Sequence, residues 1–530
     1  MKPRAFLARP HGPPAPGERL AAIDVGSNSI RLLVAEYDAQ GGIKVIDEVK
    51  DQPRLASGIA ESGRLDEFAM ARAIQALSRM REVAERRGVR RLAAVATSAV
   101  REAANGKDFI ERVRREVGIP LRVIDPETEA NLSWRSVAHH FPITTDRVLV
   151  ADIGGGSLEL VGAVNGMVEL TRSLPFGAVR LTEQYLFESR SRSKEVARLR
   201  AKVRKQLKKA LPWREWSRCT VIGSGGSFTN MGRMALARRG LASDSAHGEV
   251  VTTAEVEQLL EWLCTLSVDR RRAVPGLNPQ RADIILAGLA VTAEVLDLSQ
   301  SRNVTVNAFG LREGILLDMV GEEGARGADP LRAMREFVDR CQGDRRHVEQ
   351  VRLLALTLFD RLAEVIGAEA SERPLLEAAA LLHDVGHIVS YTKHHRHSFD
   401  LIMHAERLNF TARDRYLVAL ISRYHRRKGP SRKHAQMARL PDDEQQIVRR
   451  LSGILRVADG LDRGHTSSVE RVTTRLTDDK LFIRAAPRLA GADLSLECWG
   501  ANRKVDVLER VTRRKVVVVP AGPGPSRRSG

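Results

Sequence analysis

Two segments of the sequence place an aspartate directly before a turn rich in glycine and hydroxyl side chains. The first is AAIDVGSNSIRLLVAEYD at residues 21–38, and the second is VLVADIGGGSLELVGAVNG at residues 148–166. In each, apolar runs flank the turn, which is typical of a strand–turn–strand hairpin. Such a hairpin suits a phosphate chain and its metal ion, because glycine lets backbone N–H groups approach oxygens that a Cβ atom would obstruct.

The two hairpins supply a matched set of candidate ligands. We expect Asp24 and Asp152 to reach a Mg²⁺ ion, directly or through water, since Mg²⁺ prefers carboxylate and water oxygens. The turn residues predicted to bind phosphate are Gly26, Ser27, Asn28, Ser29, Gly154, Gly155, Gly156 and Ser157. A single hairpin of this kind is often only a tight turn, but two with matching aspartates predict that a phosphate chain is held from both sides.

A third glycine-rich turn, VIGSGGSFTNMG at residues 221–232, follows a predicted strand and opens a predicted helix. Gly225 and Gly226 would then offer helix N-terminal amides to an anion. The alternative is a loop that merely needs flexibility.

The elements that must position these turns alternate between strands and helices. Residues 19–142 are predicted to form one α/β lobe and residues 143–328 a second, so that each lobe carries one hairpin. Residues 329–466 are predicted to be helical. Residues 467–520 are predicted to form a small α+β domain, with VERVTTRLTDDKLFIRAAP, LSLECW and RKVVVVP as strands. The proline- and glycine-rich ends, 1–18 and 521–530, are predicted to be disordered tails.

Composition argues against several classes of protein. No apolar run reaches the roughly 18 residues of a membrane span, and the first residues lack the apolar core of a signal peptide. Cys219, Cys264, Cys341 and Cys498 lie far apart, which predicts neither a disulfide framework nor a zinc finger. The expected compartment is the cytoplasm.

The formal net charge of +19 favours a polyanionic partner such as inorganic polyphosphate or a highly phosphorylated nucleotide. Aromatic residues make up only 4% of the chain, which argues against nucleic acid because few stacking platforms are available. Much of the positive charge falls in RSRSKEVARLRAKVRKQLKKA, residues 190–210, a predicted helix. This segment either attracts a polyanion or is simply a solvated face, and the sequence favours neither reading.

Six of these stretches together resemble the exopolyphosphatase/guanosine pentaphosphate phosphohydrolase family, within the superfamily of sugar kinases, actin and chaperone ATPases. They are AAIDVGSNSIRLLV, AVATSAVREAANG, VIDPETEANLSW, LVADIGGGSLELV, VIGSGGS and GLREGILL. The resemblance runs from about residue 19 to the end of the chain. It implies an α/β fold with two actin-like lobes around a cleft, followed by the two C-terminal domains.

The resemblance also assigns residues. Glu129 matches the family glutamate that acts as base for water, although the acidic residue expected before it is Thr128, and Glu127 is a candidate substitute. Arg101 matches an arginine that contacts phosphate, and Glu159 an acidic residue that orients metal or water. Arg281 and Arg312 are further candidates for the phosphate path, with surface ion pairs as the alternative.

The helical segment resembles the HD phosphohydrolase domain, in which histidines and aspartates gather on a metal ion. The matching residues are His347, His383, Asp384 and Asp459, with His397 and His425 as candidate ligands of a second metal or of phosphate. Imidazole and carboxylate together suit a transition metal better than Mg²⁺. The alternative is a relic fold whose polar residues serve packing or polyanion binding.

The sequence therefore predicts a Mg²⁺-dependent exopolyphosphatase, in which a terminal phosphoryl group passes to water activated by Glu129. Hydrolysis of guanosine pentaphosphate by the same residues is the nearest alternative. A kinase or ATPase of the same superfamily and a sensor with little catalysis are the others. The family further implies a homodimer.

Overall fold

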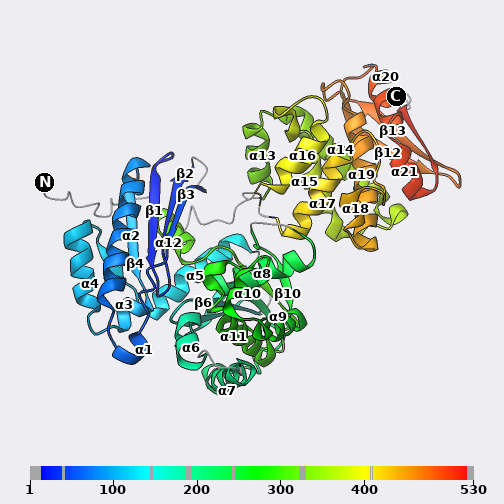
Figure 1. Cartoon of the computed structure of the whole chain (residues 1–530). Coiled ribbons are helices and arrows are strands. Elements are labelled where there is room, and N and C mark those ends of the chain that lie inside the picture. The colour runs from blue at the N-terminus through cyan, green and yellow to red at the C-terminus, as the bar shows by residue number, and fades with distance from the viewer. Residues whose placement is uncertain are drawn as a thin grey trace. The chain divides into compact units, whose positions relative to one another are not determined.

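The computed structural model describes residues 14–38, 42–141, 143, 147–186, 192–241, 245–321, 330–405, 408 and 410–521. Most of the two predicted tails therefore lies outside the described residues. The chain divides into two compact units, residues 1–328 and 329–530, and we describe each by itself. Figure 1 shows the elements and their labels.

The N-terminal unit contains two sheets. The first has the strand order β3-β2-β1-β4-β5 and consists of β1 (Arg19–Val25), β2 (Ile30–Tyr37), β3 (Ile43–Asp51), β4 (Arg91–Ala96) and β5 (Leu121–Val123). The second has the order β10-β11-β9-β6-β7-β8 and consists of β6 (Arg147–Ile153), β7 (Leu158–Val164), β8 (Met167–Leu174), β9 (Thr220–Ser224), β10 (Val250–Thr252) and β11 (Asn303–Val306).

The two sheets repeat one plan. In each, the first three strands form an antiparallel meander and the next strand pairs in parallel with the first, so that β1 pairs with β4 as β6 pairs with β9. Strands β1 and β6 are apolar and buried on both faces, as is typical of central strands that helices cover. The prediction of an α/β chain with one hairpin in each lobe agrees with this topology.

The helices of this unit surround the sheets. They are α1 (Ile59–Ser62), α2 (Glu67–Arg86), α3 (Ser98–Glu102), α4 (Gly106–Arg112), α5 (Pro126–His140), α6 (Ala178–Tyr185), α7 (Arg192–Ala210), α8 (Gly226–Arg238), α9 (Thr253–Thr265), α10 (Val268–Arg272), α11 (Ile285–Leu298) and α12 (Leu311–Val320), with a π-helical turn at Val113–Val117 and a 3₁₀ turn at Pro279–Arg281.

Two helices cross between the lobes. Helix α12 packs Ile315 and Leu316 on Leu20 and Leu33 of the first sheet, although its sequence falls in the predicted second lobe. Helix α5 packs against Val150 and its neighbours in the second sheet, although it belongs to the predicted first lobe. The two helices contact each other between the sheets (Figure 1). Each of the two helices therefore packs on the sheet of the other predicted lobe.

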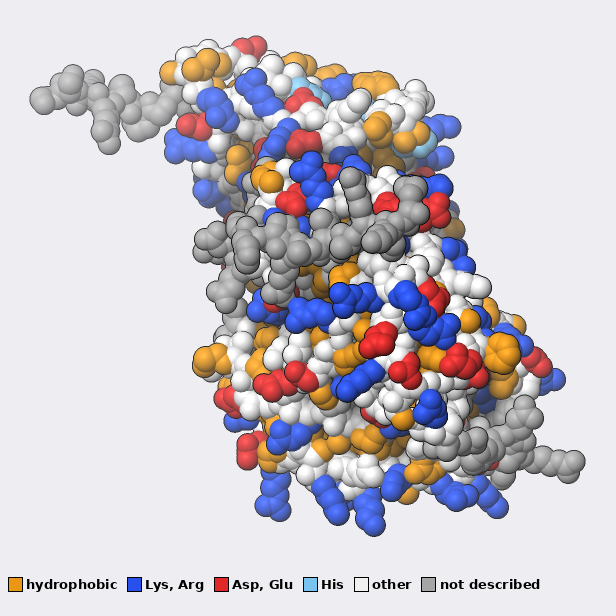
Figure 2. All heavy atoms as spheres, turned by 90° about the vertical axis from the view of Figure 1, so that its left-hand side faces the viewer, with side chains coloured by type: hydrophobic (Ala, Val, Ile, Leu, Met, Phe, Trp, Pro, Cys, Tyr) orange, Lys and Arg blue, Asp and Glu red, His pale blue; other side chains and the backbone are white. Residues whose placement is uncertain are grey.

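The basic segment forms helix α7, and its charges divide into two groups. Arg200 and Arg204 bind the buried carboxylate of Glu294 on α11, with Nε–O distances of 2.6 and 2.5 Å. The exposed residues are Lys194, Arg198, Lys202, Lys205, Lys208 and Lys209. In Figure 2, Lys and Arg side chains project from the lower edge of the molecule, where Figure 1 draws α7.

The C-terminal unit combines helices with one small sheet. Its helices are α13 (Pro330–Arg340), α14 (Arg345–Ile366), α15 (Arg373–Leu382), α16 (His394–Met403), α17 (Ala412–Arg423), α18 (Ala435–Ala438), α19 (Asp442–Gly460), α20 (Ser495–Asn502) and α21 (Asp506–Thr512), with 3₁₀ turns at Ala370–Glu372 and Val385–Ile388. The sheet joins β12 (Val469–Leu476), β13 (Lys480–Pro487) and β14 (Lys515–Pro520) in that order.

One expectation for this unit differs from the structure. The segment LSLECW was predicted to be a strand, but Ser495–Asn502 is helix α20. The alternation of apolar and polar residues suggested a strand. The buried residues Leu494, Cys498 and Ala501 instead follow helical spacing. Helices α20 and α21 pack on α19.

Neither a membrane helix nor a disulfide is found within the described part of the chain. None of its helices combines the length and the apolar character that crossing a membrane requires. All four cysteines are free.

Candidate active site

The N-terminal unit encloses a pocket of about 130 Å³ where the two hairpins meet. The pocket is lined mainly by polar side chains and glycines, which come from both sheets and from α5, α8 and α12. The residues are Asp24, Gly26, Ser27, Asn28, Ser29, Arg31, Thr97, Ser98, Glu129, Ser133, Asp152, Ile153, Gly154, Gly155, Ser157, Glu159, Ser224, Gly225, Gly226, Thr229, Arg281, Ala308, Phe309, Gly310, Leu311, Arg312 and Glu313.

The hairpins have the same internal geometry. Gly26 N–H donates to the carbonyl of Ser29 at 3.1 Å, and Gly154 N–H donates to that of Ser157 at 3.0 Å. Asp24 lies opposite Arg31 across the first strand pair, and Asp152 lies opposite Glu159 across the second. Cross-strand partners point to the same face of a sheet, so each hairpin presents a pair of charged side chains to the pocket.

The tips of the hairpins touch. A Cβ atom on Gly155 would lie 2.9 Å from Cβ of Ser27 and 3.0 Å from the backbone nitrogen of Asn28, closer than packed atoms approach. The hydroxyl groups of Ser27 and Ser98 hydrogen bond at 3.0 Å beside this contact. Glycine at position 155 therefore permits the approach of the two lobes that closes the pocket.

Glu129 enters the pocket from the first turn of α5. The Asp125 side chain caps this helix by accepting from the Thr128 N–H at 2.7 Å, and Pro126 occupies its first position. Arg101 Nη1 donates to Glu129 Oε2 at 3.1 Å and to the carbonyl of Ile124 at 2.8 Å. Burial raises the pKa of Glu129 to about 7, although Arg101 lowers it.

Four further carboxyl groups line the pocket, those of Asp24, Asp152, Glu159 and Glu313, and burial raises the pKa of the first three. Burial raises the pKa of Asp24 to about 6, against the attraction of Arg31 and Arg312. Burial raises the pKa of Asp152, whose Oδ2 accepts from Ser133 Oγ at 2.8 Å. Burial, together with the carboxylates of Glu129 and Asp152, raises the pKa of Glu159 well above its usual range.

Cationic groups face these acids. Arg281 is buried, and burial together with Arg31 lowers its pKa to about 10, which leaves it charged at neutral pH. Arg312, in the first turn of α12, is buried and donates to Glu48 Oε1 at 2.7 Å. Helix α8 begins at Gly226 after Gly225, whose φ of +92° favours glycine, and its first amides lie in the pocket wall.

The structure brings the predicted cleft residues together, with two qualifications. Arg101 lies behind Glu129, outside the pocket wall, and Gly156 packs against Ser27 and Ser98. Arg281 and Arg312 both line the pocket. Glu127 and Thr128 are exposed on the first turn of α5, so Glu129 alone of this triplet is buried.

Sequence reasoning missed Arg31, Ser133, Thr229, Phe309 and Glu313. Arg31 had a usable signal, because it holds in the first hairpin the position that Glu159 holds in the second. Ser133 follows Glu129 by one helical turn, so it shares the helix face that was already assigned to the site.

The acidic set fits a divalent cation. Oδ1 of Asp24 is buried and has no hydrogen-bond partner, which favours a cation as its missing partner. The groups whose ligand atoms already lie within 4.8 Å of one another, among the residues described, all belong to the C-terminal unit. Mg²⁺ is commonly held by one or two carboxylates plus substrate phosphates, so the cleft suits Mg²⁺ together with a phosphate ligand.

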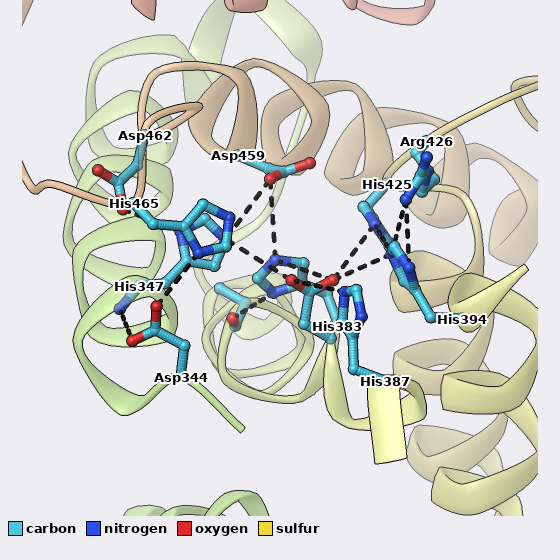
Figure 3. Close-up of polar contacts among 12 residues, drawn as sticks. Asp344, His347, His383, His387, His394, His425, Arg426, Asp459, Asp462 and His465 are labelled. Carbon is cyan, nitrogen blue, oxygen red and sulfur yellow. Dashed lines mark hydrogen bonds and ion pairs between the residues drawn. The ribbon is translucent and has the colours of Figure 1, made fainter. Parts of the chain in front are cut away.

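The C-terminal unit brings His347, His383, Asp384 and Asp459 into one cluster, shown in Figure 3. His347 Nε2 lies 3.8 Å from Asp384 Oδ2 and 3.6 Å from Asp459 Oδ1. His425 also belongs to the cluster, whereas the imidazole that faces it comes from His394 and not from the predicted His397. The α15 helix ends at Leu382, and His387 reaches Asp384 from the following 3₁₀ turn.

The two lobes repeat one strand plan, and each presents a hairpin with an Asp-x-Gly bend to a shared pocket. This arrangement defines an α/β protein of the actin-like class. The chain belongs to the Ppx/GppA phosphatase family, whose model matches residues 33–323. A second model, Ppx/GppA phosphatase domain III, matches residues 331–488. The family predicted from the sequence is therefore confirmed.

Curated relatives carry two different names. A guanosine-5'-triphosphate,3'-diphosphate pyrophosphatase from Vibrio vulnificus (strain YJ016) is 28% identical over 503 residues, which cover 92% of this chain and 96% of the relative. Exopolyphosphatase 1 from Mycobacterium leprae (strain TN) is 31% identical over 313 residues, which cover 58% of this chain and 90% of the relative.

Solved structures support the fold of the N-terminal unit. An exopolyphosphatase from Cytophaga hutchinsonii has a TM-score of 0.53 and 26% identity, and the match covers 57% of this chain and 98% of that one. The Aquifex aeolicus member of the Ppx/GppA family has a TM-score of 0.50 and 32% identity, covering 57% and 97%.

Proposed function

We propose that the protein is an exopolyphosphatase, which hydrolyses the terminal phosphoanhydride of inorganic polyphosphate and releases orthophosphate. The observation that carries this proposal is the placement of Glu129 in a pocket closed by two facing hairpins, each with an Asp-x-Gly bend. A proton acceptor with a pKa of about 7 lies beside amides and guanidinium groups that suit phosphate oxygens.

We assign the following roles to the pocket residues. The glycine turns of both hairpins, the first amides of α8, Arg281 and Arg312 bind phosphate oxygens. Glu129 accepts a proton from water as the water oxygen bonds to the terminal phosphorus. The bond from that phosphorus to the bridging oxygen breaks, and the shortened chain leaves with the bridging oxygen. Arg101 holds the Glu129 carboxylate in place.

Asp24, Asp152 and Glu159 are the residues that would hold Mg²⁺. The ion would neutralise charge on the transferred phosphoryl group. A divalent cation would also offset the negative charge of the carboxylates that line the pocket.

Hydrolysis of guanosine pentaphosphate is the second candidate function. One observation favours it, since the relative named for that class of nucleotide aligns with 92% of this chain, whereas the exopolyphosphatase aligns with 58%. The net charge of +19 favours the longer polyanion.

Three further expectations stand as proposals. The helical part of the C-terminal unit is an HD-like domain, followed by a small α+β domain. The protein acts in the cytoplasm, and it forms a homodimer.

Phosphate release tests the proposed function. Purified protein with Mg²⁺ is given long-chain polyphosphate and guanosine pentaphosphate in parallel, and each reaction is repeated with a chelator in place of Mg²⁺. Faster release from polyphosphate that the chelator abolishes is the expected result. Release from the nucleotide alone would move the function to guanosine pentaphosphate, and release that survives the chelator would contradict the Mg²⁺ requirement.

A further inference from the structure

A row of charged side chains crosses the first sheet from the pocket to the sheet edge. Asp24 of β1 pairs with Arg31 of β2, and Arg31 pairs with Lys50 of β3. Directly opposed residues of neighbouring strands point to the same face of a sheet, and such strands lie about 4.8 Å apart. Lys50 therefore shares a face with Asp24 and lies about 10 Å from it along the row, on the edge strand β3.

Helix α8 leads away from the pocket in a similar way. Gly226 and Thr229 of this helix line the pocket, and Arg233 follows Thr229 by one helical turn on the same face. Within the described residues, Nε of Arg233 and Nε of Arg281 are buried without a hydrogen-bond partner, and Arg281 is only 6% exposed. Buried N–H donors without an acceptor are rare, so both groups favour an anion as the missing partner.

The positive charge of this region is not balanced by its acids. Glu48 Oε1 is bound by Arg312 Nη1 at 2.7 Å, and Asp283 Oδ2 is bound by Arg54 Nη1 at 2.9 Å. Lys50 forms no ion pair with any residue that the structure describes. The carboxylates on either side are therefore already paired, and the ammonium group of Lys50 has no counterion in the chain.

The pKa of Lys50 reflects this surplus of positive charge. Desolvation, and after it the guanidinium groups of Arg31 and Arg281, lower the pKa of Lys50 to about 8. The charge of Arg233 acts in the same direction, whereas that of Glu48 opposes it. Cations gathered in this way repel one another, and a bound anion would offset the repulsion.

A second hollow, of about 390 Å³, lies next to these residues. Gln52 lines it and follows Lys50 by two positions, and Gln280 lines it and precedes Arg281. Nε2 of Gln52 is a further buried donor for which the described residues provide no acceptor. The full lining is Gln52, Arg54, Arg272, Pro279, Gln280 and Asp283. The hollow thus offers cations and amide groups, and its one carboxylate is already bound by Arg54.

We propose that Lys50, Arg233 and this hollow form a distal phosphate subsite, which holds internal phosphates of a polyphosphate chain whose terminal group lies beside Glu129. The inference rests on the proposed function for the identity of the ligand. The pocket of about 130 Å³ encloses only the end of a long chain. Arg31 lines the pocket and neighbours Lys50, so it connects the two sites. Affinity should therefore rise with chain length until the subsite is filled.

The test compares Lys50→Gln with Lys44→Gln. Both lysines are exposed on β3, and six residues, about 20 Å of strand, separate them. The two variants therefore lose the same charge from the same strand. Lys50→Gln should raise KM for long-chain polyphosphate by about fivefold, and by progressively less for shorter chains down to tripolyphosphate. Lys44→Gln should keep the wild-type KM for every chain length.

Arg233→Gln provides a second variant. It removes a partly buried donor from the same subsite, so KM for long-chain polyphosphate should rise by about tenfold, again with a smaller effect on tripolyphosphate. Thermal melting verifies that the variant is folded. A rise in KM that is the same for all chain lengths, in either variant, would overturn the subsite, because the residue would then act on the terminal phosphates.

Equilibrium binding of long-chain polyphosphate in chelator separates this inference from the proposed function. A wild type that binds polyphosphate but releases no phosphate with Mg²⁺ would contradict the proposed function, and the subsite would still predict weaker binding by Lys50→Gln than by Lys44→Gln. Equal binding by these two variants would overturn the subsite, and no binding by wild type would overturn both. A loss confined to guanosine pentaphosphate would also overturn it, because the group held there would belong to the nucleotide.

Discussion

At the scale of single residues, the pocket is organised by two cross-strand pairs. Asp24 faces Arg31 in one hairpin and Asp152 faces Glu159 in the other, so equivalent positions carry opposite charges. One hairpin thus brings a cation beside its aspartate and the other brings a second acid. This difference places a cation suited to phosphate oxygens beside Asp24, and a second carboxylate suited to a metal ion beside Asp152.

Arg31 provides a test of this division. We predict that Arg31→Met lowers kcat/KM for polyphosphate by about 100-fold, because one preorganised charged donor is lost from the pocket. Arg31→Lys keeps the charge without the planar fork and should lose less. Steady-state phosphate release measures both variants. An Arg31→Met variant with unchanged kcat/KM would show that Arg31 does not contact the substrate.

The raised pKa values predict how stability depends on pH. The pKa values of Asp24, about 6, and Glu129, about 7, exceed the values near 4 of an unfolded chain. Between about pH 4 and pH 7 the folded pocket therefore holds protons that the unfolded chain has released, and the free energy of unfolding falls as pH rises.

Thermal melting in chelator measures this effect. The melting temperature of metal-free wild type should fall between pH 5 and pH 8 by several degrees more than that of the double variant Asp24→Asn/Glu129→Gln. Added Mg²⁺ should restore wild type at pH 8 and not the double variant. Identical slopes for the two proteins would contradict the assigned pKa shifts.

At the scale of elements, α7 shows that a basic helix can serve two purposes. Arg200 and Arg204 converge on Glu294, which is 1% exposed, so these two arginines neutralise a buried charge. Lys202 lies exposed on the same helix. Some charges of this helix therefore stabilise the fold, and others are exposed to solvent.

We predict that Arg200→Met lowers the free energy of unfolding by about 1–3 kcal/mol, because the buried Glu294 loses one of its two arginine partners. Lys202→Met, the matched control, should change it by less than about 0.5 kcal/mol. Urea denaturation measures both. The double variant Arg200→Met/Glu294→Met should recover most of the loss, and a further loss instead would show that packing rather than charge is at stake.

The sequence predicted the hairpins well because their signal is local. An apolar run, an aspartate and a glycine turn specify the strand, the bend and the position of the acidic side chain without reference to the rest of the chain. The exchange of α5 and α12 between the sheets was not predictable in the same way. Their apolar positions indicate which side is buried, but not which sheet covers it.

The histidine that faces His425 was not predicted, for a related reason. His394 and His397 lie in one histidine-rich stretch, and the structure places His394 Nε2 3.2 Å from Asp384 Oδ1. One helical turn separates His394 from the partly buried His397, and spacing in the sequence cannot resolve which of the two imidazoles faces the cluster.

At the scale of the whole molecule, positive charge extends well beyond the pocket. Figure 2 shows Lys and Arg side chains interspersed with acidic ones over the face it draws. The sequence left open whether the basic surface of α7 attracts a polyanion or is merely solvated, and salt dependence distinguishes the two.

We predict that kcat/KM for long polyphosphate falls steeply with ionic strength, because steering by surface charge is screened. Replacing Lys194, Lys202, Lys205 and Lys209 by Gln should reduce this slope and leave kcat unchanged. Guanosine pentaphosphate, a shorter anion, should show a smaller effect. An unchanged slope for polyphosphate in the variant would identify α7 as a solvated face.

The central claim is that Glu129, in the pocket between the hairpins, activates water. The most direct test compares Glu129→Gln with Glu127→Gln, its exposed neighbour on α5, in phosphate release and in equilibrium binding of polyphosphate. We predict that Glu129→Gln lowers kcat by about 10²–10⁴-fold while binding persists, and that Glu127→Gln behaves as wild type. Turnover near the wild-type rate in Glu129→Gln would contradict the account and place the reaction elsewhere in the chain.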